Sequence, residues 1–129
     1  MVVYLDSCIA IYAVEGPVPL QELVLAAMER SKATFVASEL VWMECRVGAI
    51  RRKALPVAAE FDAFFSRIPF VHLTHEVFEI AAKLRASHSI RTPDAIHLGA
   101  AKAAGCAEFW TNDARLRNAA APLACISPL

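Results

Sequence analysis

The sequence predicts an α/β fold in which a mostly parallel sheet is covered by helices on both faces. Short apolar runs alternate along the chain with longer segments whose apolar residues have helical spacing, and this order is typical of βαβ crossovers. The 129 residues are 57% hydrophobic and 20% charged, without a Ser/Gly-rich or Pro-rich tract, which is the composition of a packed interior. We therefore expect residues 1–129 to form a single domain.

The first strand and the first two helices are expected near the N-terminus. Val2–Leu5 is a short apolar run bounded by polar residues, as in a buried strand, and Ser7 suits the N-cap of a helix directly after it. Gly16–Pro17 breaks this helix. Leu20–Ser31 has apolar residues at helical spacing and predicts the second helix.

A second strand and two further helices follow in the middle of the chain. Thr34–Ala37 resembles a strand, and Ser38 suits the N-cap of a longer helix that reaches about Lys53. Pro56 suits the start of the next helix, because the N–H group that proline lacks has no partner within the first turn. The strand and the helices continue the alternation of the N-terminal segment.

The C-terminal half also alternates. Phe70–Leu73 is predicted as a third strand, Glu76–Ser87 as a helix, and Thr92–Pro93 as the N-cap and first residue of another helix. Phe109–Thr111 predicts a further strand, and a short helix separates it from a last apolar stretch, Leu123–Ile126. In such sheets ligands bind beyond the carboxyl ends of the strands, so functional residues are expected at that edge.

Charge and targeting signals narrow the function only slightly. Thirteen basic and thirteen acidic residues give a formal net charge of zero, which neither supports nor excludes a nucleic acid partner. The N-terminus lacks the basic start of a signal peptide, and no uncharged stretch approaches the ~20 residues of a membrane span. The four cysteines form no C-x-x-C pair, which argues against a zinc cage or a disulfide framework. We expect a cytoplasmic protein with buried thiols and no membrane association.

Three aspartates lie at or near the predicted carboxyl edge of the sheet. Asp6 directly follows the first strand, and Asp113 follows the strand that ends at Thr111. Asp94 lies in the first turn of a helix, where free N–H groups and the helix dipole favour a negative charge. Taken alone, Asp6 and Asp113 are ordinary turn formers or caps, and Asp94 is an ordinary helix stabiliser. Their occurrence together is harder to explain in this way.

Glu44 is predicted on an inward helix face, because aliphatic residues lie three and four positions away from it. A carboxylate on such a face needs a partner. Its ordinary interpretation is an exposed helix residue or half of an ion pair with Arg46 or Arg51. If Glu44 shares a recess with the three aspartates, the acids repel one another unless a cation neutralises them, and oxygen ligands favour Mg²⁺ or Mn²⁺ over zinc.

The motifs that carry these acids, in this order and spacing, resemble the PIN-domain ribonucleases, especially the VapC toxins of prokaryotic toxin–antitoxin pairs. The resemblance spans essentially the whole chain and rests on Tyr4–Ser7, on Glu44 within a helix, on Arg91–Ala101 and on Trp110–Leu116. Its most specific piece is the Thr-Pro-Asp-Ala-Ile-His-Leu segment. The resemblance implies a three-layer α/β/α PIN-like domain with acids at the carboxyl ends of a central, mostly parallel sheet.

The resemblance further implies a Mg²⁺- or Mn²⁺-dependent endoribonuclease that hydrolyses RNA phosphodiester bonds. By position, Asp6, Glu44 and Asp94 match the acidic core of metal ligands and catalytic residues, and Asp113 matches the fourth, more variable acid. An ion held there would orient a water and increase its hydroxide character, and the sequence does not assign the acid that accepts the proton. Supporting contacts are assigned to Ser7, Thr111 and Asn112.

RNA must also be bound, and basic residues near the acids predict a basic rim. The RNA-binding candidates are Arg46, Arg51, Arg52, Arg91 and Arg115. The alternative for these arginines is a set of ordinary solvated helix faces. His97 lies three positions after Asp94 and is interpreted as a core histidine with a satisfied hydrogen bond rather than as a catalytic residue.

The apolar segments Leu20–Met28 and Phe61–Phe65 exceed what one small core covers, which predicts self-association. The resemblance adds a homodimer and a VapB-type antitoxin that covers the active site. Two rival functions are a noncatalytic PIN-like module that binds RNA or protein, and an aspartyl-phosphate phosphatase of the haloacid dehalogenase type. The phosphatase is disfavoured because it calls for a second aspartate two positions after Asp6, where this chain has Cys8.

Overall fold

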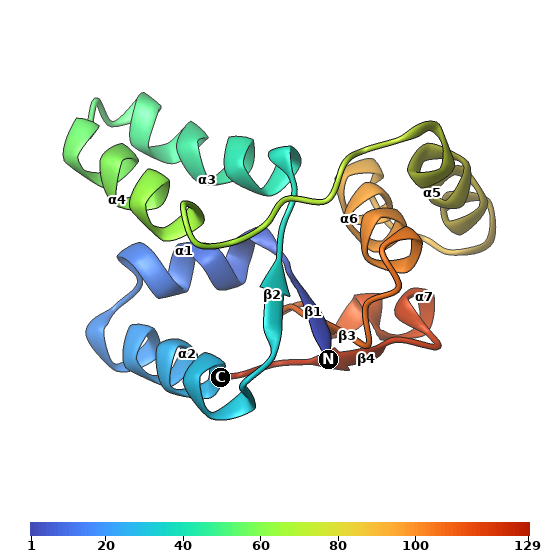
Figure 1. Ribbon diagram of the computed structural model, residues 1–129. Helices are drawn as coiled ribbons and strands as arrows, with labels where there is room; N and C mark the ends of the chain where they lie inside the picture. Colours follow the sequence, from blue (N-terminus) through green and yellow to red (C-terminus); the bar gives the residue numbers. More distant parts are fainter.

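A parallel sheet of four strands forms the centre of the computed structural model, which describes residues 1–129 (Figure 1). The strand order is β2-β1-β3-β4, and each neighbouring pair is parallel. The strands are β1 (Val2–Leu5), β2 (Thr34–Val36), β3 (Glu108–Trp110) and β4 (Ala124–Ile126). The predicted three-layer α/β/α architecture with a parallel sheet is thereby confirmed.

Seven α-helices surround the sheet. They are α1 (Ser7–Glu15), α2 (Val18–Ser31), α3 (Glu39–Arg51), α4 (Leu55–Phe65), α5 (His75–Ser87), α6 (Thr92–Ala103) and α7 (Arg117–Ala120), the last preceded by the 3-10 turn η1 (Ala114–Leu116). None of these helices is by itself long and apolar enough to cross a membrane, and only α1 and α2 taken together, bent by 117° at their junction, reach the necessary length and composition.

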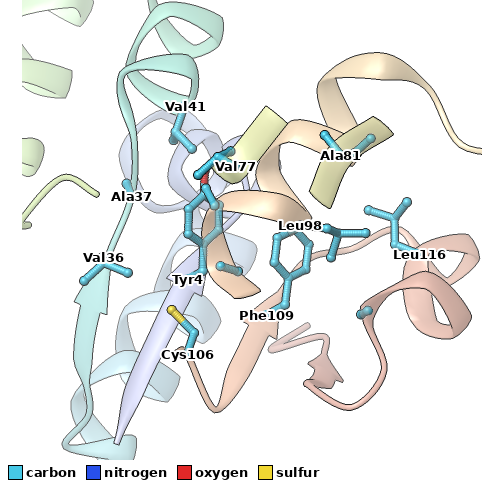
Figure 2. Close-up of a cluster of buried hydrophobic side chains, with 14 of the residues drawn as sticks. Tyr4, Val36, Ala37, Val41, Val77, Ala81, Leu98, Cys106, Phe109 and Leu116 are labelled. Atoms are coloured by element: carbon cyan, nitrogen blue, oxygen red, sulfur yellow. The ribbon is translucent and has the colours of Figure 1, made fainter. Parts of the chain in front are cut away.

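Alternation along β1 divides the core into two clusters. Val3 and Leu5 point to one face of the sheet and pack with residues of α1 and α2, including Val24. Tyr4 points to the other face, where its ring stacks on Phe109 at 5.5 Å between centroids and packs with α5 and α6 (Figure 2). Helices therefore cover both faces, as the sequence predicts.

Helices α5 and α6 approach each other closely at Gly99. A Cβ atom at this position would lie 2.6 Å from the backbone oxygen of Val77, so only glycine fits there without a shift of the backbone. The two helices lie side by side in Figure 1. Packing against α5 therefore helps to fix α6, which carries Asp94 in its first turn.

Two predicted helix caps are wrong, and a third is right in position only. The N-cap of α1 is Asp6 rather than Ser7, because the Asp6 carboxylate accepts a hydrogen bond from the Ser7 amide at 2.8 Å. The N-cap position of α6 is Arg91, and Thr92 is already helical. Ser38 is the N-cap residue of α3, as predicted, but its hydroxyl makes no capping bond and instead lies 2.8 Å from the Tyr4 hydroxyl.

The predicted strand at residues 70–73 is also absent. Phe70 forms only an isolated parallel bridge with Ala37, which lies just beyond the end of β2. Backbone bonds from Ala37 N–H to Pro69 O and from Val71 N–H to Ala37 O make this contact. The segment then leaves the sheet for α5, whose N-cap Thr74 accepts a bond from the Val77 amide.

Candidate active site

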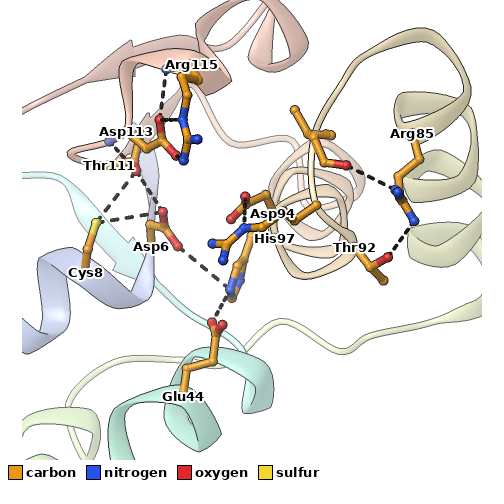
Figure 3. A network of polar contacts seen from close by, with 12 residues as sticks. Asp6, Cys8, Glu44, Arg85, Thr92, Asp94, His97, Thr111, Asp113 and Arg115 are labelled. Carbon is orange, nitrogen blue, oxygen red and sulfur yellow. Dashed lines mark hydrogen bonds and ion pairs between the residues drawn. The ribbon is translucent and has the colours of Figure 1, made fainter.

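The first two site residues lie side by side because the sheet is in register. Leu5 of β1 pairs with Trp110 of β3, so the residues that follow, Asp6 and Thr111, meet at the carboxyl edge. The Thr111 hydroxyl donates to Asp6 Oδ2 at 2.7 Å, while the Ser7 amide donates to Asp6 Oδ1. The Asp6 carboxylate is thus held from two sides (Figure 3).

Burial sets the electrostatics of Asp6. Only 6% of the residue is exposed, and this desolvation raises the pKa of its carboxyl above the usual range, with a smaller contribution from the negative charge of Asp94. His97 and the hydrogen bonds from Thr111 and Ser7 partly offset the rise. An ionised Asp6 at this position therefore gains from any positive charge placed next to it.

His97 lies between Asp6 and Glu44. Its ring is 1% exposed, with Nε2 at 2.5 Å from Glu44 Oε1 and 3.8 Å from Asp6 Oδ1. Nδ1 lies 2.8 Å from the Tyr4 hydroxyl, so both ring nitrogens have partners. The interpretation as a buried histidine with satisfied hydrogen bonds is confirmed. The sequence did not identify Asp6 and Glu44 as partners of His97. Its only signal was that His97 lies three positions after Asp94, on the same side of the helix.

Glu44 projects from α3 toward His97, and the alternative interpretation, an ion pair with Arg46 or Arg51, does not hold. Arg46 instead donates to Asp62 at 2.8 Å, and the partner of Glu44 comes from α6. Partial burial raises the pKa of the Glu44 carboxyl, but the hydrogen bond and charge of His97, the Ser7 side chain and Arg91 outweigh it and bring the pKa below its usual range. Glu44 is therefore ionised at neutral pH.

Asp94 and Asp113 each have an arginine partner. Arg91 Nε lies 3.3 Å from Asp94 Oδ2, and Arg115 makes a bidentate pair with Asp113 at 2.9 and 2.7 Å. These bonds from Arg115 lower the pKa of the Asp113 carboxyl. All of these side chains line one small recess of about 30 Å³. The recess brings Asp94 and Asp113 together although they are far apart in the sequence.

The four acids, Asp6, Glu44, Asp94 and Asp113, are named the acidic site below. They do not point into separate regions of solvent: Figure 3 shows Asp6, Glu44 and Asp94 around His97, with Asp113 beyond Thr111. Their oxygen donors suit a hard divalent cation such as Mg²⁺ or Mn²⁺. No group of three or more His, Cys, Asp or Glu side chains is close enough to hold a metal as the side chains now stand.

Side chains of the protein itself contact each acid of the acidic site. His97 lies next to Asp6 and Glu44, Arg91 pairs with Asp94, and Arg115 pairs with Asp113. The two arginine side chains are 75% and 81% exposed, so they can turn outward without leaving the core. The chemistry of the four carboxylates fits a divalent cation, and binding one requires the arginines to turn outward and the acid side chains to move closer together.

The supporting residues differ in their positions. Thr111 and Ser7 contact Asp6, as described above. Asn112 makes no hydrogen bond to the acids. Its backbone N–H donates to Cys8 Sγ at 3.3 Å, and its side-chain oxygen accepts a bond from the Ser127 hydroxyl. Cys8 was missed by the sequence analysis: its sulfur lies 3.8 Å from Asp6 Oδ2. Burial raises the pKa of the Cys8 thiol to about 11, so this group stays protonated and is a poor nucleophile.

Of the five RNA-binding candidates, only two lie beside the acidic site. Arg91 and Arg115 do so through the pairs described above. Arg46 contacts Asp62 and lies over the Trp42 ring. Arg52 pairs with Glu15, and Arg51 and Arg52 lie at the far end of α3, roughly 10 Å along the helix axis from Glu44. The predicted basic rim is thus reduced to Arg91 and Arg115.

Comparison with known proteins agrees with this architecture. The family model described as PIN domain matches residues 3–122. Similar solved structures include VapBC2 from Rickettsia felis bound to a fragment of its promoter DNA, with a TM-score of 0.83, 19% sequence identity and coverage of 98% of both chains. A toxin–antitoxin complex from Klebsiella pneumoniae has a TM-score of 0.79 and 22% identity, again over 98% of both chains.

A third similar structure is VapBC-1 from nontypeable Haemophilus influenzae, with a TM-score of 0.79 and 14% identity over 99% of this chain and 98% of that chain. Identities this low show a shared fold and leave the chemistry to be argued from the site. No curated protein matches this chain in sequence.

Proposed function

This chain belongs to the PIN-domain family, and from that premise we propose that residues 1–129 form a single PIN-like domain that acts as a metal-dependent endoribonuclease. We further propose that it is the toxin of a VapBC-type toxin–antitoxin pair. The observation that carries the proposal is the acidic site: Asp94 and Asp113 line one recess, the charge of Asp94 acts on Asp6, and His97 lies between Asp6 and Glu44.

The proposed roles follow from the geometry of the four acids. Asp6, Glu44 and Asp94 would hold Mg²⁺ or Mn²⁺, with Asp113 as the fourth ligand or as a base. A cation bound there supplies a water of increased hydroxide character and compensates charge on the scissile phosphate. Thr111 and Ser7 orient the Asp6 carboxylate through hydrogen bonds of 2.7 and 2.8 Å.

Arg91 and Arg115 fit the role of RNA-binding residues in this proposal. Their guanidinium groups are exposed, and each now contacts a carboxylate of the acidic site. A phosphate of the RNA backbone offers the same bidentate acceptor geometry as a carboxylate. When the acids bind a cation, the two arginines are free to contact the RNA next to the scissile bond.

The proposed partners are an RNA substrate, a VapB-type antitoxin and a second copy of the chain. Structural relatives include toxin–antitoxin complexes, which supports the antitoxin. A groove of about 600 Å³ between α2 and α4, lined by Met28, Phe64 and Ile68 among others, is a surface where an apolar segment of such a partner would fit. The proposed place of action is the cytoplasm, where the RNA substrate and an antitoxin are both present.

The experiment that tests the proposal measures RNA cleavage and maps the new ends in total RNA. Asp94→Asn keeps the size of the side chain and removes its charge, so cleavage in Mn²⁺ is expected to fall about 100-fold or more. EDTA is expected to stop wild-type cleavage. Asp62→Asn, at an exposed aspartate bound by Trp42 and Arg46, is the matched control. Cleavage that survives both EDTA and Asp94→Asn would refute a metal-dependent nuclease at the acidic site, and a wild type that produces no new RNA ends would refute nuclease activity itself.

A noncatalytic PIN-like module is the second candidate. The specific observation in its favour is that each acid of the acidic site already has a hydrogen-bonding or ion-pairing partner within the chain. Such a module would bind RNA or a protein with the same affinity in EDTA and in Mn²⁺, without producing new RNA ends. The two candidates are thus separated by the same end-mapping experiment.

A further inference from the structure

A chain of hydrogen-bonded side chains runs from the core to the acidic site. The Ser38 hydroxyl lies 2.8 Å from the Tyr4 hydroxyl, which lies 2.8 Å from His97 Nδ1. His97 Nε2 then lies 2.5 Å from Glu44 Oε1. Ser38, Tyr4 and His97 are at most 1% exposed, so these groups have no water as an alternative partner. The four residues come from β1, α6, α3 and the position just before α3.

The bonds of this chain have a defined direction. The carboxylate of Glu44 can only accept, so His97 Nε2 must carry the proton that is donated to it. In the neutral ring, Nδ1 is then an acceptor, and the Tyr4 hydroxyl, which burial keeps protonated, donates to it. The Tyr4 oxygen in turn accepts from Ser38. Tyr4 and Ser38 therefore select the His97 tautomer that donates to Glu44.

The Tyr4 ring is a rigid anchor for this chain. It stacks on Phe109 with an angle of 7° between the planes, and it lies within the larger hydrophobic cluster. The His97 ring cannot rotate without breaking its bonds to Tyr4 and Glu44 together. Glu44, by contrast, has a flexible side chain that is 29% exposed and has no arginine or lysine partner. The Ser7 side chain and the charge of Arg91 also act on Glu44, but the bond from His97 at 2.5 Å is its shortest contact and comes from the most deeply buried partner.

We propose that His97 is a positioning residue, held by Tyr4 and Ser38 in the tautomer that donates from Nε2, and that it fixes the Glu44 carboxylate beside Asp6 for binding of a divalent cation. This inference rests on the proposed function. It adds three residues, His97, Tyr4 and Ser38, to the four acids as determinants of metal affinity. A hydrogen-bonded partner behind a ligand commonly changes metal affinity by about 10- to 100-fold when it is removed.

The decisive variants are Tyr4→Phe, His97→Ala and His97→Gln. Mn²⁺ binding is measured by titration calorimetry on the full chain, with folding checked by circular dichroism. Tyr4→Phe keeps the stacked ring and removes only the hydroxyl, and it is expected to raise the Kd for Mn²⁺ about tenfold. His97→Ala is expected to raise it further. His97→Gln keeps an N–H donor near the Nε2 position and is expected to restore most of the affinity.

Two matched controls are available. Tyr12→Phe changes the only other tyrosine of the chain, on α1, and His88→Gln changes a histidine outside the acidic site; both are expected to leave the Kd unchanged. Long-range ¹H–¹⁵N spectra report the His97 tautomer without any metal, and Tyr4→Phe is expected to shift the proton distribution between Nδ1 and Nε2. The His97→Gln spectrum assigns the signal, because only that signal disappears.

The outcomes separate the two proposals. If wild type binds Mn²⁺ and Tyr4→Phe and His97→Ala bind it with the wild-type Kd, the positioning role is refuted while the nuclease proposal stands. If His97→Gln is as weak as His97→Ala, a donated bond is not what His97 supplies, and the role is again refuted. If wild type binds no Mn²⁺, the metal-dependent function fails and the positioning role fails with it.

Discussion

At the scale of single residues, Asp6 combines a structural and a chemical task. Its carboxylate caps α1, accepts from Thr111 and remains buried at the end of β1. Capping stabilises the fold, whereas burying the charge destabilises it, as the raised pKa of the carboxyl indicates. A residue with opposing contributions of this kind is expected where function rather than stability sets the choice of side chain.

Replacing Asp6 by asparagine is therefore expected to stabilise the metal-free protein at neutral pH. Asparagine still caps a helix and still accepts from Thr111, but it removes the buried charge. The expected gain is on the order of 1 kcal/mol in the free energy of unfolding. Chemical denaturation in EDTA measures it. A variant less stable than wild type would mean that His97 more than compensates the charge of Asp6.

The stability that Asp6→Asn gains over wild type should increase as the pH rises. Because the pKa of Asp6 is raised in the folded chain, the folded chain binds more protons than the unfolded chain between the ordinary and the raised pKa. The stability of wild type relative to Asp6→Asn therefore falls as pH rises through this window. Denaturation near pH 4 should show a smaller difference between the two proteins than denaturation at neutral pH.

At the scale of secondary structure, the contact of α5 with α6 depends on one glycine. Gly99→Ala places a Cβ atom 2.6 Å from the Val77 carbonyl and forces the helices apart. The expected loss is about 1–3 kcal/mol in the free energy of unfolding. Gly48→Ala in α3 is the matched control, since its Cβ meets only the flexible Arg52 side chain, and a gain of about 0.5–1 kcal/mol is expected. Equal effects of the two substitutions would contradict the close contact.

Most elements could be predicted from the sequence, because apolar periodicity and turn residues are local signals. The strand predicted at residues 70–73 fails for a nonlocal reason: Ala37 offers it a partner at one residue only. The three aspartates were predictable as a set, since they follow strands or begin a helix, and Glu44 was predictable from the aliphatic residues three and four positions away from it. The hydrogen bond between His97 and Glu44 could not be predicted from the sequence, because it joins residues 53 positions apart and depends on how α3 packs near α6.

At the scale of the whole molecule, one apolar row remains without a partner. Met43, Val47 and Ile50 are spaced along one side of α3 and are 50%, 37% and 63% exposed. Such a row on a small protein is a candidate interface, and it lies on the helix that carries Glu44. Its position offers a specific surface for the proposed homodimer.

Light scattering is therefore expected to give about twice the 14.1 kDa mass of one chain, and Val47→Glu is expected to shift the protein to the monomer. The added charge would be buried without a partner in the interface. Leu55→Glu, at an exposed leucine of α4, serves as the control and should leave the mass unchanged. A wild-type monomer at micromolar concentration would contradict the prediction.

Cation binding should also be visible as a change in the stability of the whole chain. A ligand that binds only the folded state stabilises it by about 2.7 kcal/mol at a concentration 100 times its Kd. Wild type is expected to gain stability with Mn²⁺, and Asp6→Asn is expected to gain little. Thermal unfolding with and without Mn²⁺ checks this, and an equal gain in both proteins would place the bound cation elsewhere.

The arginines and the histidine that now accompany the acids have a consequence for how the protein matures. A cluster of unpaired carboxylates would hinder collapse of the newly made chain until an ion arrived. Here His97, Arg91 and Arg115 supply the opposite charge or proton from within the chain. Refolding of the denatured chain in EDTA should thus still yield protein with native secondary structure, and later addition of Mn²⁺ should leave its circular dichroism spectrum unchanged.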